Sequence, residues 1–262
     1  MMDCLLQGKL ISLRALRVFK EMPRELVKSV TACDLSEFSR SLFVKNLELN
    51  SLTSDNISYN LGDTNGYLYN SQFDVVDIDP YGSMVPFIYS AIRALGGRGG
   101  PGLLCVTCTD TKVLMGPDKH KCYYDYGASR GGADCLEESA LRIALYALSR
   151  AASMQQKSIK VLLAVHSDFY IRLFVEVGVG KKNCWQTVEQ HGCLLTCQAC
   201  GAQWANKFGH FEGAKLIFDS PKGGAPCRFC GGEVTLSLLI RRTNLARFAI
   251  RRIICEIFGF RT

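Results

Sequence analysis

The sequence predicts an α/β protein built on an open, doubly wound parallel sheet and followed by a smaller cysteine-rich part. Three observations support this fold class. Apolar runs alternate with helical patterns over the first three fifths of the 262 residues, several of these runs end in an acidic residue, and the chain becomes polar, cysteine-rich and basic beyond residue 180. With 48% hydrophobic and 21% charged residues, the composition is that of a globular protein.

The expected elements follow in strand–helix order. A strand at 27–34 precedes a helix at 37–50, for which Ser36 is the expected N-cap. The remaining predictions are strands at 57–63, 73–79 and 103–109, helices at 85–95 and 136–154, and two strands around a polar turn within 159–177. We therefore expect one domain over 1–157 and a second, partial domain over 158–262.

Charge is distributed unevenly between these two parts. Residues 1–180 hold 19 basic and 19 acidic side chains, whereas residues 181–262 hold 12 and 5, so the net charge of +7 belongs to the second part. No apolar run reaches the length of a membrane span, and the first residues do not form a secretory signal. Thirteen cysteines without an export signal indicate a reducing compartment. The nucleus, the cytoplasm and the mitochondrion all fit this pattern, and secretion does not.

Three acids, Asp34, Asp63 and Asp79, lie at or just past the ends of predicted strands. The carboxyl ends of parallel strands meet at one edge of a sheet, so these side chains are expected to face a common crevice. An acid after the second strand can hold the ribose hydroxyls of an adenosine cofactor. The alternative for each acid alone is an ordinary cap or turn.

The turn Asp79-Pro80-Tyr81 directly follows a predicted buried strand. This pattern is typical of enzymes that methylate amino groups. The exocyclic amine of a base is a poor nucleophile because its lone pair is delocalised into the ring. A carboxylate and a backbone carbonyl that accept its two N–H bonds localise the lone pair, and the carboxylate can take the proton. Asp-Pro pairs also form ordinary turns, so the pattern alone leaves both interpretations open.

Two cysteine pairs form the strongest local motif. A gap of 26 residues separates the pair Cys197 and Cys200 from the pair Cys227 and Cys230, and a glycine follows each pair. Four thiolates suit a structural, tetrahedral zinc site. Reduced free cysteines and a thioredoxin-like redox role are the alternatives, and Cys193, with Cys184 and His191 near it, is a candidate additional ligand.

The final segment, residues 238–262, places six arginines on an apolar periodic background. A helix with a basic face would suit phosphates or an anionic surface. The other interpretation is a terminal helix that packs on the body of the protein with solvated arginines, and this one is slightly favoured.

Four segments, FDVVDIDPYGS, LLCVTCTDTKVLMGPDKHKCYYDYGA, ESALRIAL and HSDFYIRLFVEV, resemble the tRNA guanine-26 N2-dimethyltransferases in order and spacing. Weaker similarity extends the match to roughly residues 12–236. The resemblance implies a class I S-adenosylmethionine-dependent methyltransferase fold. It also implies transfer of methyl groups to the exocyclic N2 of guanine 26 in tRNA. Because no apolar run is long enough to span a membrane, no membrane partner is expected.

The resemblance also implies roles for individual residues. Asp34 would hold the cofactor ribose and Asp63 the adenine amino group, while Arg14 would contact the cofactor or the tRNA. Asp79 would be the general base, Pro80 would offer its carbonyl and Tyr81 would pack on the base. Asp110 lies near the same crevice without a sharper role.

The chain departs from the family pattern at both ends. Residues 2–12 stand where family members have a strand and a glycine-containing loop, with Ser12 where glycine is expected. The first strand and the cofactor loop are therefore expected to be missing, and the chain to be truncated or alternative at both termini. The leading hypothesis is a tRNA N2-guanine methyltransferase, and the alternative is a non-catalytic form that binds zinc and RNA or a protein partner. A DNA-base amino-methyltransferase shares the Asp-Pro-Tyr chemistry but leaves the TCTD and HSDFY segments unexplained.

Overall fold

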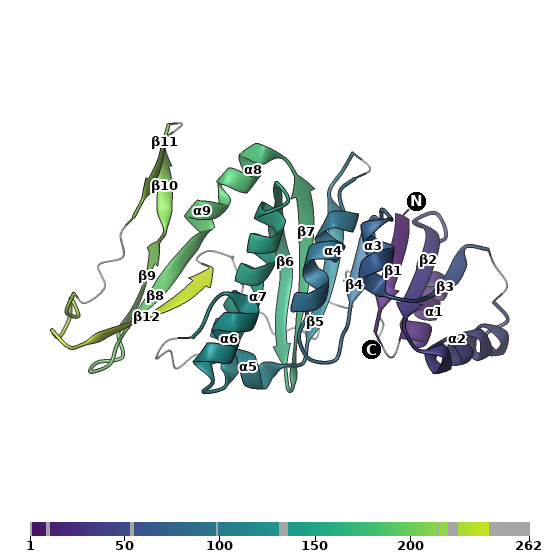
Figure 1. Cartoon of the computed structure of the whole chain (residues 1–262), viewed down its shortest axis with the longest axis horizontal. Helices are drawn as coiled ribbons and strands as arrows, with labels where there is room; N and C mark the ends of the chain where they lie inside the picture. Colours follow the sequence, from purple (N-terminus) through teal and green to yellow (C-terminus); the bar gives the residue numbers. More distant parts are fainter. Residues whose placement is uncertain are drawn as a thin grey trace.

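Seven strands form one sheet at the centre of the computed structural model, which describes residues 2–8, 11–52, 55–97, 99–130, 136–213, 215–219 and 225–240 (Figure 1). Their order is β3-β2-β1-β4-β5-β7-β6. Neighbouring strands from β3 to β5 are parallel, and β7 runs antiparallel to both β5 and β6. The strand bounds are β1 Met2–Gln7, β2 Val27–Asp34, β3 Ile57–Leu61, β4 Val75–Ile78, β5 Gly102–Cys108, β6 Lys157–Ser167 and β7 Tyr170–Val179.

Helices cover both faces of this sheet, which confirms the doubly wound α/β fold. Alternate residues of β1 enter two separate cores. Leu5 belongs to the core under α3, α4 and α7, whereas Cys4 and Leu6 belong to the core under α1 and α2. The helix bounds are α1 Ile11–Glu21, α2 Glu37–Leu49, α3 Thr64–Tyr69, α4 Val85–Ala94, α5 Thr111–Met115, α6 Lys119–Tyr126 and α7 Leu136–Ser153.

The expectation that the first strand is missing is wrong. Met2–Gln7 forms β1 in the middle of the sheet, paired in parallel with β2 on one side and with β4 on the other. Its four inner residues are all buried, so the strand lacks the polar–apolar alternation that marks a half-buried strand. The buried Asp3 makes the strand harder still to predict, because acidic residues are rare in buried strands. Its carboxylate accepts hydrogen bonds from Ser29 at 2.6 Å and from Lys28 at 3.3 Å.

The predicted domain boundary at 157/158 falls too early. Residues 157–179 form the β6–β7 hairpin, which completes the seven-stranded sheet. The tip of this hairpin lies beside the end of β5, because Ile171 pairs with Cys108. The hairpin therefore reaches the same sheet edge as the carboxyl ends of the parallel strands.

The cysteine-rich part follows β7 and contains two small sheets, β12-β8-β9 and β10-β11 (Figure 1). It contacts α7 through the half-buried His191, whose Nε2 lies 2.8 Å from Ser149 Oγ. Burial, helped by the charge of Arg150, lowers the pKa of His191 to about 4. The bounds are α8 Lys181–Trp185, α9 Thr187–Gln190, β8 His191–Cys197, β9 Gln203–Lys207, β10 Gly209–Glu212, β11 Lys215–Phe218 and β12 Val234–Ile240.

The predictions that no helix spans a membrane and that the arginine-rich segment forms a helix are tested only within the described residues. None of the helices in the described ranges is long and apolar enough to cross a lipid bilayer. Residues 238–240 of the arginine-rich segment end β12 rather than beginning a helix. The rest of that segment, 241–262, lies outside the described residues.

Candidate functional site

The carboxyl edge of the sheet gathers the three acids predicted from the sequence. Asp34 ends β2, Asp63 lies two residues past β3, and Asp79 directly follows β4. This edge is the lower one in Figure 1, where the chain turns from β5 into α5. Open α/β sheets bind their ligands at this edge, so the candidate site lies here.

Asp79 and Arg14 form an ion pair at this edge. Arg14, in the first turn of α1, donates from Nη2 to Asp79 Oδ2 at 2.6 Å and from Nη1 to Asp77 Oδ2 at 3.3 Å. Asp79 Oδ1 has no hydrogen-bond partner among the described residues, and the side chain is 22% exposed. One oxygen of Asp79 is therefore fixed and the other is available to a ligand.

Asp77 and Arg172 form a buried ion pair that sequence reasoning did not find. Arg172 in β7 donates to both oxygens of Asp77 in β4 at 2.8 Å, and also to Thr107 Oγ1 in β5 at 2.7 Å. Their side chains are only 15% and 10% exposed. Burial alone would lower the pKa of Arg172, but the Asp77 carboxylate more than offsets this and raises it. Because both of its oxygens are occupied, Asp77 is not available as a base.

One signal in the sequence points to this pair. A charged residue in a buried strand almost always has a partner of opposite charge. Asp77 and Arg172 are such residues, but they lie 95 positions apart, so only the strand order β4-β5-β7 shows that they meet.

The Asp-Pro-Tyr turn is held in place by the chain that follows β5. Gly82, with a left-handed φ of 84°, donates to Thr109 Oγ1 at 2.7 Å and accepts from the Thr109 N–H at 2.9 Å. Pro80 is buried, whereas the Tyr81 ring is 72% exposed at the edge. The turn thus presents an aromatic surface beside Asp79.

A second set of bonds connects this turn to Asp110. Ser83 Oγ donates to Tyr126 Oη at 2.9 Å, and Tyr126 donates to the Asp110 carboxylate at 2.7 and 2.8 Å. Burial raises the pKa of Asp110, while the Tyr126 hydrogen bond works against that rise. Burial also raises the pKa of Tyr126, and the Cys108 and Asp110 side chains add to the effect. Tyr126 therefore remains a donor, and Asp110 has a positioning place in the site that the sequence did not reveal.

A glycine does follow β1, contrary to the expectation that the chain lacks one there. Gly8 has a φ of +133°, and a side-chain carbon at this position would collide with the backbone carbonyl of Asp79. Only glycine allows so close an approach between the end of β1 and the Asp-Pro-Tyr turn. Lys9 and Leu10 lie outside the described residues, and so do the side chains of Ile11 and Ser12.

The other two acids make local bonds. Asp34 Oδ1 accepts the Ser36 N–H at 2.8 Å, and its Oδ2 has no partner among the described residues. Asp63 caps α3 by accepting from the N–H groups of Asn65 and Gly66 at 3.1 and 3.0 Å. Asp63 therefore acts as a helix N-cap, which is the alternative interpretation of this acid, and its contact with an adenine remains a prediction.

Residues at this edge fit S-adenosylmethionine, the cofactor implied by the resemblance. Gln7 Oε1, at the end of β1, is buried without a hydrogen-bond partner in the described part of the chain. With Asp34 Oδ2 at the end of the neighbouring β2, it supplies an acceptor that a ligand rich in amino and hydroxyl groups would satisfy. Gly8, the residue after Gln7, lies close to the backbone of Asp79.

Four cysteines form a candidate metal centre in the second part of the chain. The Sγ atoms of Cys197, Cys200, Cys227 and Cys230 all lie within 4.8 Å of one another, and two of the separations are 3.5 and 3.7 Å. Four sulfurs bound to one zinc at about 2.3 Å lie about 3.8 Å apart, so the cluster has the dimensions of a tetrahedral site. Cys193 is buried in β8, and Cys184 donates to a backbone carbonyl at 3.4 Å; neither belongs to the cluster.

An arginine and two aromatic rings lie next to these cysteines. Arg228 sits 4.7 Å from the centre of the Phe229 ring and 5.4 Å from that of Trp204, and the two rings meet edge to face. Phe229 is 65% exposed. We call these three residues the Arg–aromatic cluster.

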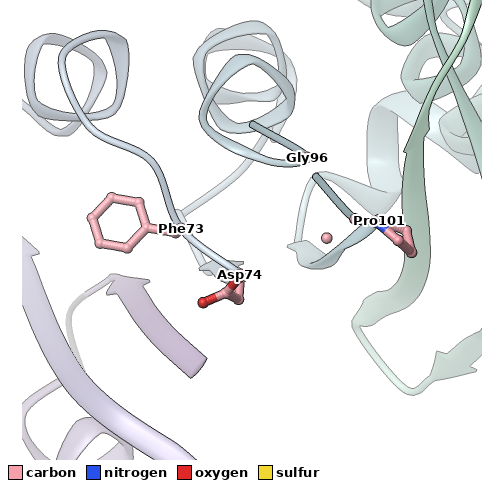
Figure 2. Close-up of a pocket in the computed structure, with 6 residues that line it drawn as sticks. Phe73, Asp74, Gly96 and Pro101 are labelled. Atoms are coloured by element: carbon pink, nitrogen blue, oxygen red, sulfur yellow. The ribbon is translucent and has the colours of Figure 1, made fainter. Parts of the chain in front are cut away.

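A pocket of about 100 Å³ lies away from the candidate site. It is lined by Phe73 and Asp74 before β4 and by Gly96 and 100–102 at the start of β5, which is the amino edge of the sheet (Figure 2). Asp74 accepts the Asp3 N–H at 2.8 Å near this pocket. The pocket is thus a small hollow between strand ends, on the edge opposite to Asp79.

Comparison with known proteins identifies the family. A family model described as N2,N2-dimethylguanosine tRNA methyltransferase matches residues 10–238. The tRNA (guanine(26)-N(2))-dimethyltransferases of Mus musculus and Schizosaccharomyces pombe are 35% and 34% identical over 84% of this chain, which corresponds to 34% and 41% of their own lengths. The chain therefore spans only about a third to two fifths of these relatives.

A solved structure agrees with the sequence comparison. Trm1 from Pyrococcus horikoshii, in complex with S-adenosyl-L-methionine, superposes with a TM-score of 0.71 at 26% identity, covering 79% of this chain and 58% of that one. The shared architecture confirms the class I methyltransferase fold. By both sequence and structure, the chain belongs to the N2,N2-dimethylguanosine tRNA methyltransferase family.

Proposed function

We propose that this chain carries the methyltransferase site of an S-adenosylmethionine-dependent tRNA enzyme that modifies the exocyclic N2 of guanine 26. One observation carries the proposal: Asp79 has a fixed Oδ2 and a partner-free Oδ1 among the described residues, and it lies beside the exposed Tyr81 at the carboxyl edge. The two relatives of Mus musculus and Schizosaccharomyces pombe are named for this reaction, and the Trm1 structure contains the cofactor.

The residues of the edge divide the chemistry among themselves. Tyr81 packs on the guanine ring, while Asp79 Oδ1 and the Pro80 carbonyl accept the two N–H bonds of the N2 amine. These bonds localise the nitrogen lone pair, which then attacks. When bound, S-adenosylmethionine supplies an electrophilic methyl group on a sulfonium. Asp79 would take the proton that the nitrogen loses when it accepts this methyl group.

Cofactor contacts are assigned to the same edge. We infer that Asp34 Oδ2 binds the ribose hydroxyls and that Asp63 lies near the adenine, with Gln7 Oε1 as an additional acceptor. Gly8 supports this arrangement because it lets the end of β1 touch the Asp79 backbone.

The cysteine-rich part is assigned to metal and RNA binding. We infer that Cys197, Cys200, Cys227 and Cys230 hold a structural zinc, because four thiolates leave no open coordination position. The Arg–aromatic cluster offers a cation and a stacking surface, which are the groups that bind unpaired RNA bases. A reducing compartment keeps such thiolates available, in line with the sequence-based expectation of nucleus, cytoplasm or mitochondrion.

A direct assay tests the catalytic proposal. Purified chain is incubated with radiolabelled S-adenosylmethionine and a tRNA transcript that has guanine at position 26, and a transcript with adenine at that position is the substrate control. Label incorporated only into the guanine-containing transcript supports the proposal, and Asp79→Asn should abolish it while calorimetry shows nearly unchanged cofactor affinity.

The alternative function has a specific motivation. The cysteine cluster and the neighbouring Arg–aromatic cluster could bind zinc and RNA without any methyl transfer, so a non-catalytic binding protein is the second candidate. It predicts tRNA binding with no heat of S-adenosylmethionine binding at high protein concentration. That combination would exclude the catalytic proposal for this chain.

A further inference from the structure

We propose that Arg14 is a positioning residue for methyl transfer, which fixes Asp79 Oδ2 so that Oδ1 faces the target amine. This inference rests on the proposed function, because it takes Asp79 as the base. It differs from the role implied by family resemblance, in which Arg14 contacts the cofactor or the tRNA.

The contacts of Arg14 support this role. Both of its terminal nitrogens point to carboxylates, Nη2 to Asp79 at 2.6 Å and Nη1 to Asp77 at 3.3 Å. The pair is only partly exposed, with Arg14 at 35% and Asp79 at 22%. A guanidinium is planar and rigid, so two contacts fix its orientation where one would leave it free to turn.

Asp77 provides the fixed point behind Arg14. Its two oxygens are already held by Arg172 at 2.8 Å, and Arg172 is held in turn by Thr107 at 2.7 Å. These residues come from β4, β5 and β7, which are neighbouring strands of the sheet. Asp77 is therefore held in one orientation; it holds Arg14, and Arg14 in turn holds Asp79. Two carboxylates alternate with two guanidinium groups, which balances the charge of the group.

Positioning matters because the carboxylate must meet an amine in one orientation. If Arg14 is lost, Asp79 can rotate, and Oδ1 no longer stays where the N2 hydrogen arrives. A misplacement of about 1 Å costs about a hundredfold in rate. The loss should therefore appear in the transfer step at saturating substrate rather than in cofactor affinity.

Arg14→Gln tests the proposal, with Arg17→Gln as the matched control. Arg17 lies one turn further along α1, pairs with Glu21 at 2.8 Å and is half exposed. We expect Arg14→Gln to lower the single-turnover rate on tRNA about a hundredfold, with S-adenosylmethionine affinity changed less than about twofold. Arg14→Lys should recover part of the rate, because its ammonium can still reach Asp79 but cannot span two carboxylates.

The opposite pattern would overturn the proposal. A parallel loss of rate and cofactor affinity in Arg14→Gln would make Arg14 a cofactor ligand, and an unchanged rate would leave it without a role. An unchanged rate in Arg17→Gln is required, since a loss there would mean that α1 tolerates no change of charge.

A second measurement does not depend on activity. With carboxyl-¹³C aspartate, the Asp79 resonance is assigned by its absence in Asp79→Asn. It should shift in Arg14→Gln and stay in place in Arg17→Gln. An Asp79 resonance that does not respond to Arg14→Gln would refute the fixed pair. If wild type methylates no tRNA, the proposed function fails, and this resonance still decides whether Arg14 holds Asp79.

Discussion

The buried pair of Asp77 and Arg172 makes a sharp prediction about stability. Asp77→Asn keeps the shape of the side chain but removes the charge that faces Arg172, whose side chain is only 15% exposed. Removal of one partner from a buried pair costs about 3–5 kcal/mol, because the remaining charge stays in a poorly solvated place. Asparagine still offers one acceptor for one of the two 2.8 Å bonds, so we expect a loss near the lower end, about 3 kcal/mol.

Urea unfolding at neutral pH measures this loss of unfolding free energy. A matched control is Glu21→Gln, which breaks the Arg17–Glu21 pair on the exposed side of α1. An exposed pair contributes about 0–1 kcal/mol, so the control should unfold close to wild type. If Asp77→Asn also unfolds within about 1 kcal/mol of wild type, the pair is hydrated in solution and cannot act as the fixed point behind Arg14.

Four further predictions concern other parts of the chain. The pKa of His191 is about 4 in the folded protein and about 6.5 in the unfolded chain, so on acidification the unfolded state takes up the proton first. Between about pH 7 and pH 5, wild type should therefore lose about 2 kcal/mol more unfolding free energy than His191→Gln. Urea unfolding measures this loss, and equal pH profiles for the two proteins would contradict the prediction. Gly8→Ala should lower the melting temperature and the transfer rate through its clash with the Asp79 backbone, and a melting curve like that of wild type would refute the close approach. Elemental analysis should find about one zinc per chain and less in Cys200→Ser, whereas a variant that keeps its metal would remove Cys200 from the site. Phe229→Ala should weaken tRNA binding by about 1–3 kcal/mol in a filter-binding titration, while Phe218→Ala, at a similarly exposed ring, should not; equal effects would mean that the Phe229 ring makes no specific contact.

Local patterns predicted the first half of the fold well. The strand Val27–Asp34 and the Ser36 cap of α2 are as expected, because β-branched residues and a capping hydroxyl act within a few positions. β1 escaped prediction because a strand buried on both faces carries no alternation, and because the polar Asp3 and Gln7 leave only a short apolar run between them. The small strands of the cysteine-rich part were also missed, since the turns at the two cysteine pairs and the contact with α7 shape these strands more than their own propensity does.

In the candidate site too, some features could be predicted from the local sequence and others could not. The position of Asp79 after a buried strand is a local feature, so the sequence placed it at the carboxyl edge. The partners of Asp77 and Arg14 depend on which strands become neighbours, and no spacing along the chain encodes that. Tyr126 belongs to one of the segments that resemble the family, but its bond to Asp110 follows only from the packing of α6 beside the end of β5.

The docking of the cysteine-rich part on α7 has a consequence for how the protein comes apart. Leu194 and Phe208, both beyond β7, pack against the same core as the inner face of α7. Two bodies that share a core melt together, so heating should give one calorimetric transition instead of two. A chelator that loosens the cysteine cluster should then shift that single peak as a whole, and a chain cut after residue 180 should leave an apolar face that promotes aggregation.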